Sequence, residues 1–258
     1  MNYQTIKVRF QESICFLQFN RPEANNTIND LLIEECHHVL ALCEESATIV
    51  VLEGSSEVFC FGADFQGIHQ GMQEKIDEQQ PSTRTPEPMY DLWLKLATGS
   101  FITISHVRGK VNAGGVGFVA ASDIVLANET AQFSLSELLF GLFPACVMPF
   151  LIRRIGFQKA HYLTLMTQPV SIQQAHEWGL VDAYEVQSES LLRKHLLRLR
   201  RLSKPAILRY KHYMSELNNS LLQSKAMALA ANQEVFSDPR NLEGIYWYVE
   251  KGKFPWER

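Results

Sequence analysis

The stretch HVRGKVNAGGVG at residues 106–117 decides the fold prediction for this chain. It follows one apolar run and leads into another, residues 118–121, so it predicts a strand, a glycine turn and a buried helix. Such a turn leaves backbone N–H groups unpaired at the helix start, where they stabilise negative charge that develops on a carbonyl oxygen. The alternative is a tight turn whose glycines only permit unusual backbone angles.

A second segment of the same design favours the first interpretation. Residues 49–54 are a β-branched run typical of a buried strand, and residues 58–65 give another strand end followed by a glycine turn. Two strand-to-turn sites, each presenting one amide, predict an oxyanion hole with two donors.

Five segments in order resemble the motifs of the crotonase (enoyl-CoA hydratase/isomerase) superfamily. They are residues 20–26 (NRPEANN, like NRPxxxN), 59–64 (FCFGAD, like FCxGAD), 109–124 (glycine turn and then SDI), 131–144 (AQFSLSELLFGLFP, like AxFxxPExxxGxxP) and 248–254 (YVEKGKF, like FxEKRKPxF). Within the superfamily, the chain is most similar to the enoyl-CoA hydratase homologues of polyketide β-branching cassettes.

The resemblance implies an α/β fold, a spiral of ββα and βαβ units followed by a helical C-terminal region. We therefore divide the chain into a spiral core, residues 1–187, and a helical region, residues 188–258, expected to cover the ligand and to form trimers or dimers of trimers. The residue pattern agrees with alternating strands and helices. It predicts strands at 6–10, 14–19, 48–53, 101–107 and 123–127, and a helix at 29–43 capped by Asn26 or Thr27.

By position, the resemblance assigns the oxyanion amides to Ala63 and Gly114 and a catalytic carboxylate to Glu137. The family's hydratases use a second glutamate three residues after the second oxyanion residue, and here that position is Gly117. The competing interpretation of Glu137 is a capping box with Ser134 at a helix start. We expect Glu137, with a pKa that burial raises, to remove the α-proton, and either Glu137 itself or a bound water to protonate the departing hydroxyl.

Gly117 suggests a hypothesis about the substrate. The missing side chain would make room for a β-carbon that bears both a methyl and a hydroxyl group. The polyketide homologues that the chain resembles act on a glutaryl group, which also carries a distal carboxylate. A cationic or hydroxyl side chain would bind that carboxylate. The candidates are Arg84, Tyr90, Lys95, His69 and Arg108. Tyr248 and Lys251 match family positions near the nucleotide end of coenzyme A. Asp64 is assigned to the substrate-binding residues, and both Asp64 and Asp123 are expected to hold turns beside the amides.

The resemblance to the polyketide homologues implies that the chain dehydrates a 3-hydroxy-3-methylglutaryl thioester to a 3-methylglutaconyl thioester. The resemblance implies an acyl carrier protein as partner and no cofactor or metal, since the acyl group arrives on phosphopantetheine of that carrier or on coenzyme A. Decarboxylation of a glutaconyl thioester and enoyl isomerisation remain alternatives, because a single base also serves them. A non-catalytic acyl-thioester-binding scaffold is the alternative of another class.

Composition narrows the possibilities further. A formal net charge of −4 gives no reason to expect a nucleic-acid partner, and no apolar run reaches the ~18–20 residues that span a bilayer. With no visible signal peptide, we expect a cytoplasmic protein. The five cysteines show neither a disulfide pattern nor zinc spacing, and a nucleophilic role for Cys60 is not favoured.

Two segments of the sequence each have two possible interpretations. The polar, proline-containing stretch 71–88 is equally compatible with a lid and with a disordered loop. The basic amphipathic segment 193–204 is either a solvated helix face with Leu196, Leu199 and Leu202 inward, or a binding surface for coenzyme A phosphates or an acidic carrier.

Overall fold

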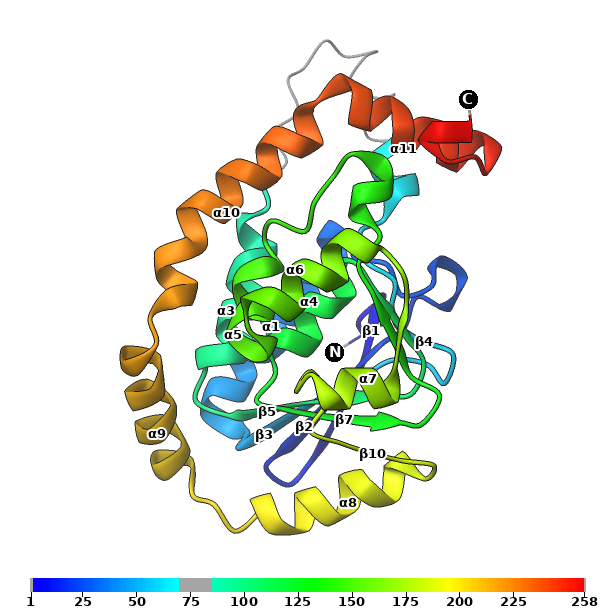
Figure 1. Cartoon of the computed structure of the whole chain (residues 1–258). Coiled ribbons are helices and arrows are strands. Elements are labelled where there is room, and N and C mark those ends of the chain that lie inside the picture. Colours follow the sequence, from blue (N-terminus) through cyan, green and yellow to red (C-terminus); the bar gives the residue numbers. More distant parts are fainter. Residues whose placement is uncertain (1, 70–84, 258) are drawn as a thin grey trace.

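The computed structural model of the chain describes residues 2–69 and 85–257 (Figure 1). Arg84 and most of the stretch 71–88 lie outside the described residues. The described part is a mixed α/β spiral with helices wrapped around it, which confirms the predicted fold class.

A six-stranded sheet forms one layer of the core, in the order β1-β2-β3-β5-β7-β10. β1 pairs antiparallel with β2 as a hairpin, and the other neighbours are parallel. The strands are β1 (Ile6–Gln11), β2 (Ile14–Phe19), β3 (Ile49–Glu53), β5 (Ile102–Val107), β7 (Ile124–Asn128) and β10 (Ala183–Glu185). Runs such as residues 49–52 are buried on both faces, as expected for a covered parallel sheet. The strands predicted from the sequence are confirmed to within two residues.

A second, four-stranded sheet has the order β4-β6-β8-β9. Its strands are β4 (Val58–Cys60), β6 (Lys110–Asn112), β8 (Gln132–Ser134) and β9 (Val170–Ser171). Successive strand pairs, β3 then β4, β5 then β6, and β7 then β8, place one strand in each sheet, which generates the spiral. The strand–turn–helix prediction for residues 106–117 was incomplete, because β6 lies between the glycine turn and the helix. A three-residue strand is too short to show a period in the sequence.

Helices fill the space beside the sheets. α4 (Gly114–Ala121) is apolar on almost every side because it lies between α3 (Glu87–Thr98) and α5 (Met148–Ile155). α1 (Asp30–Ser46) packs against α3, and its N-cap is Asn29, whose Oδ1 accepts a hydrogen bond from the Leu32 amide at 2.9 Å. The predicted caps, Asn26 and Thr27, were therefore wrong by two or three residues. The remaining core elements are η1 (Pro22–Ala24), η2 (Glu137–Phe140), α6 (Phe157–Met166) and α7 (Ile172–Glu177).

From Ser188 onward the chain is helical and passes around the outside of the core (Figure 1). The elements are α8 (Ser188–Leu199), α9 (Lys204–Leu217), α10 (Ser220–Ser237), α11 (Pro239–Lys251) and η3 (Pro255–Glu257). α8 buries Leu192 and Leu196 against the large sheet, and Leu199 is partly buried, but Leu202 is 46% exposed, so that residue was wrongly placed inward. Figure 1 places α8 at the opposite end of the molecule from α11.

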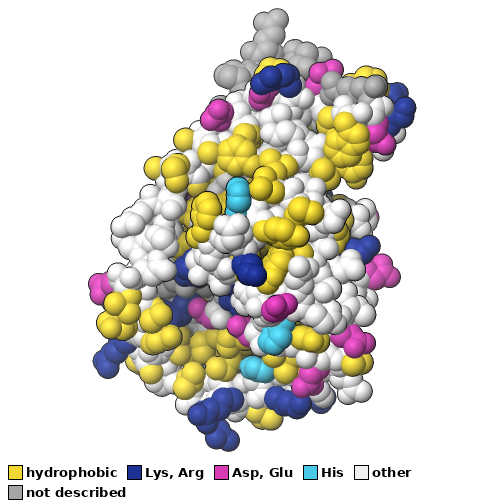
Figure 2. Space-filling model, viewed as in Figure 1, with side chains coloured by type: hydrophobic (Ala, Val, Ile, Leu, Met, Phe, Trp, Pro, Cys, Tyr) yellow, Lys and Arg dark blue, Asp and Glu magenta, His cyan; other side chains and the backbone are white. Residues whose placement is uncertain are grey.

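Large apolar side chains are exposed on α6, α9 and α10. On α6 they are Phe157, Tyr162, Leu165 and Met166, and hydrophobic groups gather in this region of the surface (Figure 2). Among the described helices, none is long and apolar enough to cross a membrane.

Candidate active site

The loop after β4 presents the Ala63 amide. Gly62 has φ +90°, a backbone angle that side chains rarely permit, and a Cβ on it would lie 2.6 Å from the Ala113 Cβ. The neighbouring groups are paired: Ile28 N–H donates to Gly62 O at 2.8 Å, and Asp64 N–H to Ile28 O at 3.1 Å. The Ala63 amide, in contrast, donates to no acceptor within residues 2–69 and 85–257. It is therefore available to a ligand.

The second amide lies directly opposite. Ala113 has φ +50° and ψ −128°, a strained conformation for a residue with a side chain. That conformation turns the chain from β6 into α4, so that Gly114 is the first helical residue and its N–H lacks an intrahelical partner. The Gly114 nitrogen is 3.2 Å from the position of a Cβ on Gly62. The two predicted oxyanion amides are thus on adjoining turns.

An ion pair holds the Ala63 loop in place. Arg21 Nη2 contacts Asp64 Oδ2 at 2.8 Å, while Asp64 Oδ1 accepts the Gly67 N–H at 3.0 Å. The Arg21 guanidinium also donates to Thr27 O at 2.6 Å. Asp64 was expected to hold a turn, and its two oxygens make these structural contacts. Asp123 similarly accepts from the Thr103 amide at 2.8 Å and from Lys211 Nζ at 2.7 Å.

Glu137 starts η2, on the loop that follows β8. It is 9% exposed, and its Oε2 has no hydrogen-bond partner among the described residues. Burial raises the pKa of its carboxyl to about 7, and the backbone N–H groups of Glu137 and Ser136 limit the rise. The capping-box alternative is wrong, because the Ser134 hydroxyl instead donates to Asn112 Oδ1 at 2.8 Å. An unpaired carboxyl near neutral pKa suits proton transfer.

A cavity of about 2100 Å³ brings the two loops and Glu137 together. Its lining includes Ala63, Gly114, Asn112, Trp93 and Glu137 from the core. α10 and α11 close it from outside through, among others, Asn232, Phe236, Leu242 and Tyr248. A carbonyl oxygen bound by both amides would therefore lie in the same space as the Glu137 carboxyl.

The structure corrects the hypothesis about Gly117. A Cβ built on Gly117 would lie 2.4 Å from Cζ2 and 2.5 Å from Cε2 of Trp93. The space beside this glycine is thus filled by an indole and is not open to a branched acyl chain. The sequence interpretation missed Trp93, because nothing in a helical apolar pattern distinguishes a core tryptophan from one that lines a cavity.

One further substrate-binding assignment does not fit the geometry. Tyr90 is fully buried and donates its hydroxyl hydrogen to Leu221 O at 2.6 Å, so it is not a carboxylate receptor. Lys251 is the last residue of α11 and is exposed outside the cavity lining, whereas Tyr248 belongs to that lining and packs against Phe140.

The other candidate receptors are also displaced from the cavity lining. Arg108 donates to Gly54 O at 3.0 Å, near Glu189. His69 packs against the Tyr246 ring, with centroids 5.1 Å apart, and Lys95 lies on α3. The described part of the cavity lining contains no lysine or arginine.

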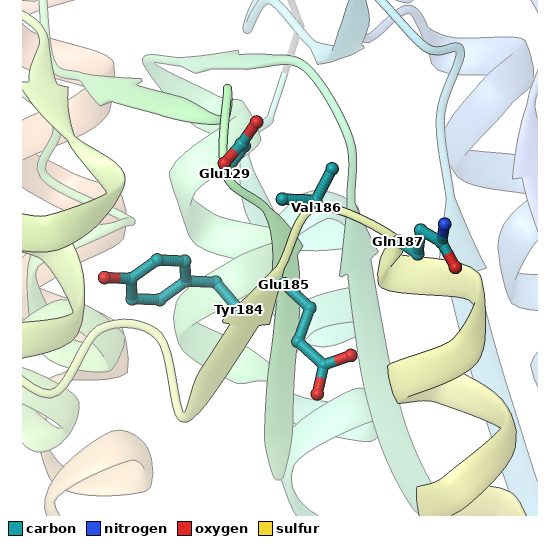
Figure 3. A pocket seen from close by; sticks show the side chains of 5 residues that line it. All are labelled: Glu129, Tyr184, Glu185, Val186 and Gln187. Carbon is teal, nitrogen blue, oxygen red and sulfur yellow. The ribbon is translucent and has the colours of Figure 1, made fainter.

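The remaining reactive groups give no second reaction centre in the described residues. All five cysteines are buried and free, and burial raises the pKa of Cys60 to about 12, which argues against a nucleophilic role. The described residues contain no cluster able to hold a metal ion. A separate pocket of about 480 Å³ is lined by Glu129 and residues 184–187 at the β7–β10 edge (Figure 3), and it shares no residue with the cavity.

The comparison with known proteins identifies the family of the chain. The enoyl-CoA hydratase/isomerase family matches residues 9–258. The chain belongs to this family. With a dehydratase among its relatives, the chain is a crotonase-family enzyme of the hydratase/dehydratase type.

Three individual relatives show which members of the family the chain is similar to. The bacillaene synthase dehydratase PksH of Bacillus subtilis is 66% identical over 258 residues, covering 100% of this chain and 98% of the relative. A crystal structure from Bacillus subtilis, assigned to polyketide biosynthesis as an enoyl-CoA hydratase (pksH), superimposes with a TM-score of 0.94 at 64% identity, over 98% of this chain and 100% of that one. The 2,3-dehydroadipyl-CoA hydratase of Escherichia coli is 28% identical over 228 residues, 87% of this chain and 81% of the relative.

Proposed function

We propose that this enzyme dehydrates a 3-hydroxy-3-methylglutaryl thioester to a 3-methylglutaconyl thioester during polyketide biosynthesis. The observation that carries the proposal is the lone buried carboxyl of Glu137, in one cavity with two unpaired amides. The high identity to a bacillaene synthase dehydratase supports the reaction direction and the polyketide context.

The reaction begins at the thioester carbonyl, whose oxygen accepts hydrogen bonds from the Ala63 and Gly114 amides. Removal of the α-proton by the ionised Glu137 places negative charge on that oxygen, where fixed N–H groups stabilise it without titrating. The electron pair then forms the Cα–Cβ double bond as the Cβ–O bond breaks. Glu137 returns the proton to the departing oxygen, and water leaves. A pKa of about 7 allows one carboxyl to accept and return a proton at neutral pH.

We further propose that the acyl group is delivered on the phosphopantetheine of an acyl carrier protein. The family's thioester chemistry and the polyketide relative support this partner. The basic segment 193–204 is a weak candidate for the carrier's docking site, because α8 lies opposite α11, whose residues line the cavity (Figure 1). Lys204 within it already donates to Ala47 O at 2.6 Å.

The working form is proposed to be a homo-oligomer, a trimer or a dimer of trimers. The exposed apolar side chains of α6, α9 and α10 support this proposal, because exposed apolar surface often marks a protein–protein interface. Light scattering of the purified protein measures the subunit number directly, and a monomer at micromolar concentration would contradict this proposal.

The decisive experiment is mass spectrometry of the acyl group after incubation with a 3-hydroxy-3-methylglutaryl carrier protein. Loss of the mass of water is expected. Loss of the mass of carbon dioxide from a glutaconyl carrier would identify a decarboxylase instead, and double-bond migration at unchanged mass an isomerase. Glu137→Gln should abolish turnover, and Glu129→Gln, a carboxyl change outside the cavity, should leave it intact. Substrate binding without turnover in the native protein would favour the scaffold alternative.

A further inference from the structure

The indole of Trp93 is a buried donor without a partner. The side chain is 2% exposed, and its Nε1 has no hydrogen-bond acceptor within the described residues. A buried indole N–H normally finds an acceptor, because leaving it unpaired costs the free energy of its lost hydration. Trp93 nevertheless lines the same cavity as Glu137, whose Oε2 is also buried and unpartnered. Two residues of one cavity lining thus carry an orphan donor and an orphan acceptor.

The surroundings hold the indole in one orientation. Phe118 and Phe150 contact it edge to face, with ring centroids 6.0 Å and 5.9 Å away. The face of its six-membered ring, at Cε2, Cζ2 and Cη2, lies against Gly117, one turn of α4 after the oxyanion residue Gly114. Nε1 is bonded to Cε2, so the N–H group lies next to this contact. A side chain at residue 117 would collide with the ring, and glycine is therefore required for the indole to be there.

We propose that Trp93 Nε1–H donates a hydrogen bond to the 3-hydroxyl oxygen of the substrate and stabilises it as it leaves. This inference rests on the proposed dehydration. The hydroxyl satisfies both orphan groups, because its oxygen accepts from Trp93 and its hydrogen is donated to Glu137 Oε2. When the Cβ–O bond breaks, the electron pair stays on oxygen, the indole hydrogen bond strengthens, and the proton from Glu137 completes the water molecule.

The indole differs from a carboxyl in one decisive way. An indole N–H does not exchange its proton with substrate near neutral pH, so Trp93 supplies only a hydrogen bond. All proton movement then stays with Glu137. By the resemblance, two-glutamate hydratases carry a carboxyl at residue 117, and here the six-membered ring of the indole occupies the space beside that position.

The test separates elimination from α-proton removal. Trp93→Phe removes the N–H and shrinks the ring, whereas site-specific replacement of Trp93 by 3-benzothienylalanine puts sulfur in place of N–H at nearly constant shape. Trp178→Phe, on a tryptophan that does not line the cavity, is the control. Two rates are measured for each protein: dehydration of the 3-hydroxy-3-methylglutaryl thioester, and exchange of the α-proton of 3-methylglutaryl thioester in D₂O, which needs no leaving group.

Loss of a hydrogen bond to a developing oxyanion is expected to slow dehydration about 10- to 100-fold in both Trp93 variants. α-Proton exchange should stay within about twofold of the native protein. Equal loss of both rates, or normal dehydration by the benzothienyl protein, would overturn the inference while leaving the proposed function in place. A raised KM for both substrates would assign Trp93 to the distal carboxylate instead. Absence of dehydration in the native protein would overturn the proposed function itself, and this inference with it.

Discussion

Substitution of Glu137 by glutamine should stabilise the protein in a way that depends on pH. The carboxyl is buried and lacks a partner for Oε2 among the described residues, so its charged form is disfavoured in the folded state. Burial raises its pKa from the ordinary value of 4.5 to about 7. Because the folded state binds the proton more tightly than the unfolded state, native stability falls as pH rises between these two values and is constant above them.

The size of the effect follows from the shift. Each pKa unit corresponds to about 1.4 kcal/mol, so an ionised Glu137 costs about 3 kcal/mol above pH 7. At pH 5 the folded carboxyl is almost fully protonated, and the cost falls below about 1 kcal/mol. Glutamine carries no charge at either pH. The stability of Glu137→Gln relative to the native protein should therefore be about 2–3 kcal/mol greater at pH 8 than at pH 5.

Urea unfolding of both proteins at pH 5 and pH 8, at one protein concentration, measures this difference. Glu35→Gln is the matched control, a buried carboxyl whose pKa is shifted in the opposite direction. Glu35 accepts hydrogen bonds from the Gln4 amide at 2.7 Å, the Thr5 amide at 2.9 Å and the Thr5 hydroxyl, and although burial acts to raise the pKa of its carboxyl, these bonds lower it overall. Its glutamine variant should be less stable by about the same amount at pH 5 and pH 8, and should lose that deficit only below pH 4.5, as pH falls through the lowered pKa. An identical stability gain for Glu137→Gln at both pH values would refute the assignment of a raised pKa to Glu137.

Three further changes test the site. The rate of dehydration should rise with pH up to about 7 and then level off, because Glu137 must be ionised to take the α-proton. A pH–rate profile of kcat/KM measures this, and a flat profile between pH 5 and 8 would contradict it. Gly62→Ala should lower kcat about 10²- to 10³-fold in the thioester assay, since the new Cβ would lie 2.6 Å from the Ala113 Cβ and displace the oxyanion amides. Full activity of this variant would show that the turn does not bind the carbonyl. Ala113→Gly should raise the free energy of unfolding by about 1 kcal/mol, because glycine adopts φ +50° and ψ −128° without strain. Denaturant unfolding measures this free energy. A lower value for the variant would mean that the contacts of the Ala113 side chain stabilise the protein by more than the backbone strain costs.

The sequence alone determined the parts of the site that are local in the chain. The glycine turns at Gly62 and Gly114 and the β-branched strands before them depend on backbone angles and on side-chain period, which neighbouring residues specify. Family motifs then assigned the amides and Glu137 by position. The short strands β6, β8 and β9 were not predicted from the sequence, because two or three residues are too few to show the alternation of side chains along a strand.

Only the tertiary structure decided what surrounds those groups. Whether Glu137 is a capping carboxylate or an unpaired acid depends on burial beneath α10 and α11, which lie about a hundred residues further along the chain. The same holds for Gly117, beside which α3 places the Trp93 ring, and for Tyr90, whose hydroxyl is bound by Leu221 on α10. Side-chain direction and solvation are set by packing between distant elements, and a linear sequence does not encode them residue by residue.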